Sequence, residues 1–212
     1  MDRTALASRP GWWRLLMTPL AVSTRNITRV FRAATPADRA GGQDWYMAAH
    51  RIALSLDPAD PIRAAAVIAV LSPMLSWPRN VVEARNVYSG QPVRALGSSA
   101  RKARMILAGA DPEQIVSGRK VHAFWRTIAD PAEPSAVVID RHAIDIAAGR
   151  VLGDKLRGSH LRRAGAYDEV AERYRRAARR LSREFDRHIT PAEVQATTWI
   201  YWRREHAVAH HR

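Results

Sequence analysis

Apolar residues recur along most of this chain at spacings of three and four positions, which is the period of an amphipathic α-helix. Alternation of apolar and polar positions, which is typical of a half-buried strand, is not found along the sequence. The short apolar run 136–139 is the one candidate for an extended segment. The pattern therefore predicts an all-α protein of about eight to ten short helices.

Prolines, glycines and short polar residues divide this pattern into individual helices. Asp44 is expected to be the N-cap of the first of them. Pro61 occupies a first-turn position, and the segment 62–71 is expected to be a buried helix because apolar residues lie on every face. Further helices are expected over 78–89, 99–107, 119–128, 140–152, 167–185 and 190–206, with a capped turn at 111–115.

The first forty residues lack a clear helical period. We expect a basic, partly irregular N-terminal arm over 1–40, which packs on the domain or contacts phosphate, and a single α-helical domain over 41–212. The apolar stretch 12–22 is interrupted by Arg14 and Pro19, so it is too short and too broken to span a bilayer, and it lacks the layout of a secretion signal. No membrane partner is therefore expected.

The charge balance indicates a polyanionic partner. Lys and Arg number 34 against 20 Asp and Glu, which gives a formal net charge of +14. Such a field favours nucleic acid over an anionic membrane surface, and the alternative is a solvated basic surface. Cysteine is absent, which excludes disulfides, a thiol nucleophile and Cys-ligated zinc or iron–sulfur clusters, and which fits a cytoplasmic protein. Neither a metal nor a cofactor is implied.

A carboxylate stands where the extended apolar run ends and the next helix begins. Asp140 occupies this position, twenty residues after Lys120, which opens another helix. The positive end of a helix dipole stabilises an anion, and a preorganised anion can stabilise the positive charge that builds on a sugar when an N-glycosidic bond breaks. The alternative is that Asp140 is only an N-cap, although one residue can do both.

Three short pieces of sequence, in this order, resemble the helix-hairpin-helix (HhH-GPD) DNA glycosylase superfamily. The segment 68–72 (Ile-Ala-Val-Leu-Ser) resembles the family's A-x-L-S helix end, and 118–121 (Gly-Arg-Lys-Val) resembles the G-x-K that opens the second helix of the hairpin. The segment 139–142 (Ile-Asp-Arg-His) resembles the V-D-x-H element with the catalytic aspartate. The resemblance covers roughly residues 60–155 and implies an HhH-like element at about 112–128 in a compact multi-helix glycosylase fold.

The chain also departs from that family. The hairpin reads Ile-Val-Ser-Gly at 115–118 where the family usually has L-P-G-V-G, and the loop after Ser72 lacks the glutamine of many relatives. The C-terminal segment 195–203 has no counterpart in the best-known members. The chain looks like a divergent branch with its own C-terminal helical part, similar to glycosylase-like proteins that act on hypermodified phage bases.

The resemblance implies a monomeric DNA glycosylase that cleaves the N-glycosidic bond of a modified or damaged base in double-stranded DNA. Base excision of this kind would serve phage defence or the processing of modified bases, and it requires flipping of the base. One alternative is a non-catalytic DNA-binding protein on the same scaffold. Another is a pyrophosphorylase or transferase that acts on hypermodified thymine.

The same resemblance suggests roles for particular residues. Asp140 would stabilise the sugar cation or activate water. Lys120 would either form a Schiff base with the sugar and cut the strand as an AP lyase, or clamp a phosphate. Trp125, Trp199, Tyr201 and Trp202 occur at helical spacing and are expected to pack in the core. The candidates for contacts with DNA or the base, each with an alternative role in packing or on the surface, are Ser72, Met74, Trp77, Asn80, Gly118, Arg119 and His142.

Overall fold

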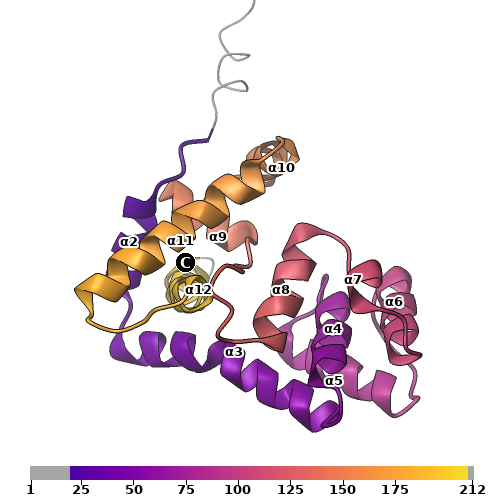
Figure 1. Ribbon diagram of the computed structural model, residues 1–212. Helices are drawn as coiled ribbons and strands as arrows, with labels where there is room; N and C mark the ends of the chain where they lie inside the picture. The colour runs from indigo at the N-terminus through magenta and orange to yellow at the C-terminus, as the bar shows by residue number, and fades with distance from the viewer. Residues whose placement is uncertain (1–19, 210–212) are drawn as a thin grey trace, which may run out of the picture.

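Eleven α-helices form the part of the chain that the computed structural model describes, residues 20–209, with side chains described through residue 206 (Figure 1). No strand occurs within that range, so the predicted all-α class is confirmed. The helices are α2 (Thr24–Ala33), α3 (Pro36–Leu56), α4 (Pro61–Leu71), α5 (Trp77–Tyr88), α6 (Gly97–Leu107), α7 (Pro112–Ile115), α8 (Arg119–Ala129), α9 (Arg141–Ala148), α10 (Asp154–Arg162), α11 (Ala166–Glu184) and α12 (Pro191–Ala209).

Two hydrophobic cores divide these helices into two lobes. The first lobe contains α4 to α8 and the C-terminal half of α3, and the second contains α2, α9, α10, α11 and α12. Helix α3 runs beneath both lobes and packs against α12, which contributes apolar side chains to both cores (Figure 1). The junction between the lobes is therefore built from α3, α12 and the segments that cross between them.

The extended segment before Asp140 crosses this junction. Val138 belongs to the first core, whereas Val137 and Ile139 belong to the second. Successive side chains of extended backbone point to opposite sides, so three consecutive apolar residues can anchor the segment in both cores at once. This arrangement explains why the run is apolar at every position and why the next residue, Asp140, emerges where the two lobes meet.

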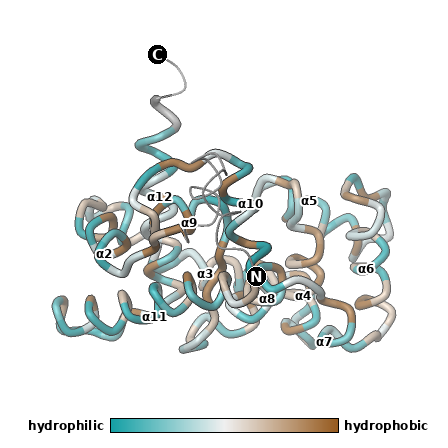
Figure 2. The backbone as a smooth tube through the Cα atoms, turned by 90° about the horizontal axis from the view of Figure 1, so that it is seen from above, coloured by the Kyte–Doolittle hydropathy of each residue, from teal (hydrophilic) through white to brown (hydrophobic). Residues whose placement is uncertain are grey.

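Helix α4 is the most deeply buried helix of the first lobe. Its residues from Ala64 to Leu71 are at most 3% exposed. Asp60 caps it by accepting a hydrogen bond from the Arg63 backbone N–H at 2.9 Å, and Pro61 occupies the first turn, as the sequence predicts. Helix α11, in contrast, lies at the edge and is largely hydrophilic (Figure 2).

The expected N-terminal arm is only partly right. Residues 1–19 lie outside the described residues, but 24–33 form α2, whose apolar face is buried in the second core. Helix α3 begins at Pro36 with a capping box between Thr35 and Asp38, so the expected domain boundary at 40/41 falls inside a helix. Asp44 is not an N-cap, because it lies within α3, where it pairs with Arg51 at 2.9 Å.

A close helix crossing explains why the glycines of α3 do not end the helix. A Cβ atom at Gly42 would lie 2.6 Å from the backbone of Thr197 in α12. Glycine in a helix interior costs about 1 kcal/mol relative to alanine, and here the close packing of α12 offsets that cost. The two consecutive glycines, Gly41 and Gly42, suggest a helix break in the sequence, but in the fold the absence of a side chain at Gly42 allows α3 and α12 to pack closely.

The remaining helices follow the predictions with two differences. Helix α9 ends at Ala148, where Gly149 adopts a left-handed conformation with φ of 75°, rather than continuing to residue 152. Helix α10 was not expected from its weak, polar pattern. Thr190 caps α12 as predicted, since its Oγ1 accepts from the Glu193 backbone N–H at 3.0 Å. Among residues 20–209, no helix is both long enough and apolar enough to cross a membrane.

Candidate active site

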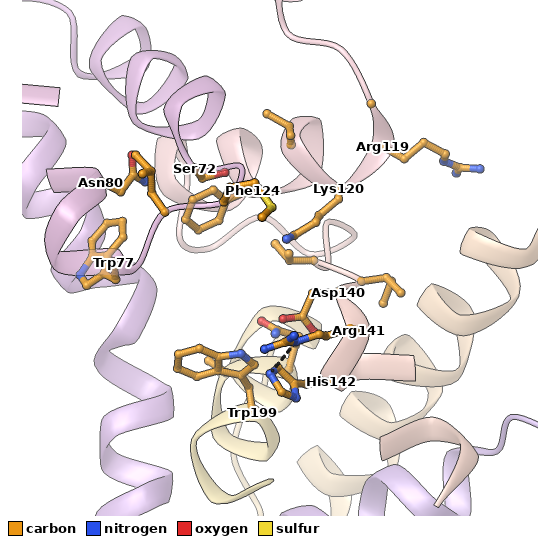
Figure 3. Close-up of a pocket in the computed structure, with 18 of the residues that line it drawn as sticks. Ser72, Trp77, Asn80, Arg119, Lys120, Phe124, Asp140, Arg141, His142 and Trp199 are labelled. Atoms are coloured by element: carbon orange, nitrogen blue, oxygen red, sulfur yellow. Dashed lines mark hydrogen bonds between the residues drawn. The ribbon is translucent and has the colours of Figure 1, made fainter. Parts of the chain in front are cut away.

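A cavity of about 990 Å³ lies at the junction of the two lobes. Ligand pockets in proteins are usually about 300–1,000 Å³, so this one is large enough for a nucleotide. All nine residues that the sequence nominated contribute to its lining (Figure 3). They come from four separate places: the loop after α4, the start of α5, the turn before α8 with the first turn of α8, and the start of α9.

Asp140 is both an N-cap and a cavity residue. Its Oδ1 accepts a hydrogen bond from the Ala143 backbone N–H at 2.8 Å, which caps α9. Its Oδ2 accepts no hydrogen bond from any described residue. One carboxylate oxygen thus fixes the side chain, and the other is available to a ligand.

Tyr167 holds the segment that carries Asp140. The Tyr167 hydroxyl accepts a hydrogen bond from the Ile139 backbone N–H at 3.1 Å and donates one to the Val137 carbonyl at 3.1 Å. Burial raises the pKa of Tyr167 to about 12, so the phenol keeps its proton and remains a donor. The contact ties α11 to the crossing segment and limits the movement of Asp140.

Lys120 lies across the cavity from Asp140. It is the second residue of α8, and Figure 3 shows its side chain reaching toward the Asp140 carboxylate. It forms no ion pair or hydrogen bond with another side chain of the described part of the chain. Gly118, which precedes this helix, has φ of 83°, a left-handed conformation that favours glycine. The tight turn places Lys120 at the cavity wall.

Arg119 is held in a different direction from Lys120. Its guanidinium pairs with Asp168, with an Nη1–Oδ2 distance of 2.6 Å, and lies 4.9 Å from the centre of the Tyr167 ring. Figure 3 shows it pointing away from Asp140. Arg119 therefore joins α8 to α11 in this structure, and a phosphate contact by it would have to compete with Asp168.

His142 lies beside Asp140 on the first turn of α9. Its Nε2 is 3.3 Å from the Nε of Arg141. Burial lowers the pKa of His142, although the negative charge of Asp140 acts in the opposite direction. The neutral imidazole is therefore favoured at neutral pH, so His142 is suited to hydrogen bonding rather than to charge pairing.

The loop between α4 and α5 forms the rim of the cavity. Ser72 ends α4, and Met74 adopts a left-handed conformation with φ of 66° while its side chain is 88% exposed. A non-glycine residue in this conformation is uncommon. The rim thus presents an apolar side chain to solvent beside the cavity.

Trp77 and Asn80 line the cavity from the first turn of α5. The Trp77 ring packs against Trp45 at 5.1 Å and Phe124 at 6.3 Å between ring centres. Asn80 is buried, and its Nδ2 donates to the Ile68 carbonyl at 3.1 Å. Its Oδ1 has no hydrogen-bond partner among the described residues. Backbone bonding, one of the two expected roles of Asn80, is therefore present.

Several lining residues were not nominated from the sequence. Trp199 was expected to pack in the core, as Trp125 and Trp202 do, but it lines the cavity with the Arg203 guanidinium 4.5 Å from its ring centre. The sequence carries a helical spacing of aromatic residues but does not show which of them faces a cavity. Other lining residues that the sequence did not nominate include Trp45, Tyr46, Phe124, Arg141, Arg157, Tyr167, Gln195 and Arg203.

The charges around the cavity are strongly unequal. Among the described lining residues, Asp140 is the only carboxylate, and five side chains are basic. Two of the five, Arg119 and Arg157, pair with Asp168 and Asp145 outside the lining, so the positive field that attracts an anionic ligand comes mainly from the other three. The basic lining residues are Arg119, Lys120, Arg141, Arg157 and Arg203.

Fold and site together define an all-α, two-lobed protein with a basic, partly aromatic cavity in which Asp140, at a helix N-terminus, is the single carboxylate that the described residues contribute. A family described as a family of unknown function (DUF7178) matches residues 17–206, and the chain belongs to it. Comparisons with curated proteins and with solved structures gave no match.

Proposed function

We propose that this protein is a DNA glycosylase of the helix-hairpin-helix type, which cleaves the N-glycosidic bond of a modified or damaged base. The observation that carries the proposal is the position of Asp140. Its capping bond fixes the carboxylate and leaves Oδ2 open to a cavity large enough for a nucleotide, in which no other described acidic side chain lies. The net charge of +14 favours a polyanion such as DNA as the partner.

The chemistry follows from this geometry. As the base leaves, positive charge develops on the sugar, and the Asp140 carboxylate stabilises that charge or accepts a proton from the attacking water. The hydrogen bonds of Tyr167 to the segment 137–139 hold the carboxylate in place before the reaction begins. A preorganised charge of this kind is worth roughly 10²–10³ in rate.

Lys120 provides the second functional group. When its amine is neutral, it can attack the sugar C1′ as the base departs, lose a proton to Asp140 or water, and form a Schiff base after the ring opens. Its open position and its direction toward Asp140 support this role (Figure 3). The alternative role is a phosphate clamp at the N-terminus of α8.

The elements around the cavity fit extraction of a nucleotide from the duplex. The short helix α7, the turn at Gly118 and α8 lie at the positions where the resemblance predicts the hairpin that approaches a phosphate backbone, and this order supports the proposal. Met74, exposed at the rim, is placed to fill the gap that an extruded base leaves in the stack. We propose the HhH-GPD fold for this chain on the order of these parts around Asp140.

The test is release of a free base from DNA. Full-length protein is incubated with duplexes that carry single modified or damaged bases, and with phage DNA containing modified cytosine or thymine, and released bases are identified by mass spectrometry. We expect release of at least one base at a rate well above the spontaneous one. Absence of release from every DNA, with DNA binding intact, would favour a non-catalytic DNA-binding protein. A requirement for pyrophosphate would indicate group transfer instead of hydrolysis.

Borohydride trapping tests the role of Lys120. If the Schiff base forms, borohydride reduces it to a stable secondary amine that links protein and DNA. The chain has three lysines, Lys102, Lys120 and Lys155, so peptide mapping can locate the link. We expect Lys120→Ala to abolish the adduct and Lys155→Ala, an exposed lysine outside the cavity, to retain it. Base release without any adduct would assign Lys120 to phosphate binding.

A further inference from the structure

A buried carboxamide forms part of the cavity wall that α12 provides. Gln195 is 6% exposed and lines the cavity together with Tyr46 of α3. The Tyr46 hydroxyl donates a hydrogen bond to Oε1 of Gln195 at 2.9 Å. The two residues are 149 positions apart in the chain and meet because α12 packs closely on α3.

This hydrogen bond determines which end of the carboxamide is free. A glutamine side chain has an acceptor oxygen and a donor NH₂ group, and it can present either one when it rotates. Burial raises the pKa of Tyr46, so its phenol stays protonated and acts as a donor to Oε1. The Nε2 group of Gln195 forms no hydrogen bond with another described residue, and it is not one of the fully buried polar atoms that lack a partner. Because Gln195 lines the cavity, this N–H donor is accessible from the cavity and can donate to an acceptor on the ligand.

The surrounding side chains favour a flat ligand. Trp45, Trp77 and Phe124 line the same cavity, with ring centres 5.1 Å (Trp45–Trp77) and 5.9 Å (Trp45–Phe124) apart. Aromatic walls bind planar groups through their faces, and the stacking of a base on an aromatic side chain is tolerant of base identity. Selection among bases must therefore come from the polar groups of the wall.

We propose that Gln195 is a specificity-determining residue that selects a base with a hydrogen-bond acceptor, such as a carbonyl oxygen, on the edge that faces α12. Tyr46 is the positioning residue, because it fixes the orientation of the amide. This inference rests on the proposed function in that the ligand is a nucleobase. A base that presents an amino group would leave two donors facing each other, which we expect to weaken its binding by about 10- to 100-fold.

The test compares bases that differ in one exocyclic group. Duplexes of one sequence carry a single central uracil or cytosine, or hypoxanthine or adenine, opposite an abasic-site analogue, with a 2′-fluoro sugar that resists cleavage. Binding of the full-length protein is measured by fluorescence anisotropy. For the wild type, we expect about 10-fold or greater preference for the oxo member of at least one pair. Equal binding of both members in both pairs would overturn the inference.

Two variants separate orientation from packing. In Tyr46→Phe, Oε1 loses its donor, so the amide can turn, and the oxo/amino ratio is expected to fall toward one while binding to plain duplex is unchanged. In Gln195→Glu, Tyr46 still binds one oxygen, the other oxygen accepts from an amino group, and the preference should reverse. The control Tyr88→Phe removes a phenol that bonds Asp57 at 3.3 Å outside the cavity, and its ratio should equal that of the wild type.

The outcomes distinguish this inference from the proposed function. If Tyr46→Phe keeps the wild-type ratio of oxo to amino binding, the Tyr46–Gln195 hydrogen bond does not orient the amide, and the inference is overturned whatever the result for Gln195→Glu. Thermal melting checks that each variant is folded, and Tyr46→Phe keeps the test decisive should the glutamate variant be unstable. Because the duplexes resist cleavage, the ratio does not depend on catalysis. Binding no tighter to any central base than to plain duplex would instead contradict recognition of a flipped base.

Discussion

Replacing Asp140 with asparagine removes one negative charge and keeps almost everything else. The asparagine Oδ1 can still accept the hydrogen bond from the Ala143 N–H, and asparagine and aspartate are comparable N-caps. The loss of stability is then limited to the charge–dipole interaction at the start of α9, about 0.3–1 kcal/mol. Base release, in contrast, should slow by roughly 10²–10³, or about 3–4 kcal/mol of transition-state stabilisation. No other described carboxylate lines the cavity to replace it.

The assay measures three quantities on the same variant: single-turnover base release, DNA affinity and the free energy of unfolding in urea. Asp60→Asn is the matched control, because Asp60 caps α4 through the Arg63 N–H at 2.9 Å and lies outside the cavity. We expect Asp140→Asn to lose release with DNA affinity retained and Asp60→Asn to retain both. Release by Asp140→Asn at the wild-type rate, or an equal loss in Asp60→Asn, would refute the reasoning.

Three further predictions concern the framework of the site. Gly42→Ala places a Cβ 2.6 Å from the backbone of α12 and should cost about 1–3 kcal/mol of unfolding free energy, whereas Gly41→Ala, 3.3 Å from a flexible side-chain end, should be close to neutral in the same urea titration. Asp145→Ala breaks a buried ion pair with Arg157 of the cavity wall and should lower the free energy of unfolding by about 3 kcal/mol. The side chain of Asp154 pairs with the same arginine but is 93% exposed, so Asp154→Ala should lower the free energy of unfolding by less than about 1 kcal/mol. Hydrogen bonds from Ser135 and then Arg126 lower the pKa of Glu133 from 4.5 to about 2, so the stabilisation of the fold by Glu133 is present above pH 4.5 and is lost as the pH falls toward 2. The free energy of unfolding, measured across this pH window, should therefore vary less with pH in Glu133→Gln than in the wild type. An unchanged pH dependence would contradict this explanation.

Local signals account for what could be predicted from the sequence. Proline in the first turn and a short polar cap mark the starts of α4 and α12, and both helices begin where these signals lie. The apolar run before Asp140 identifies a buried extended segment, and the residue after it is an N-cap at the cavity. Helix caps and apolar runs depend only on residues that are close in the sequence, so they can be predicted from a single sequence.

Contacts between distant segments account for what could not be predicted. Gly41 and Gly42 suggest a break when only their neighbours are considered, because their helical position is stabilised by α12, which lies about 150 residues further along the chain. The same crossing brings Gln195 to Tyr46 and turns Trp199 toward the cavity. Helical periodicity shows which side chains share a helix face, but it does not show which helix or cavity that face contacts.

Local sequence signals position the groups proposed for the reaction, whereas contacts between distant segments position the groups proposed for selectivity. Asp140 and Lys120, the groups proposed for the reaction, each stand in the first turn of a helix or at its cap, where local sequence fixes their position. Gln195 and Tyr46, the groups proposed for selectivity, depend on the packing of α12 against α3. Helix α12 also packs against α9, which Asp140 caps, so a change that displaces α12 is expected to disturb both pairs of residues. Conservative changes at Gln195 or Tyr46 that leave α12 in place are expected to alter the choice of base without moving the carboxylate, because Tyr167 holds the segment that carries Asp140. We therefore expect chemistry and selectivity to be separable by such substitutions.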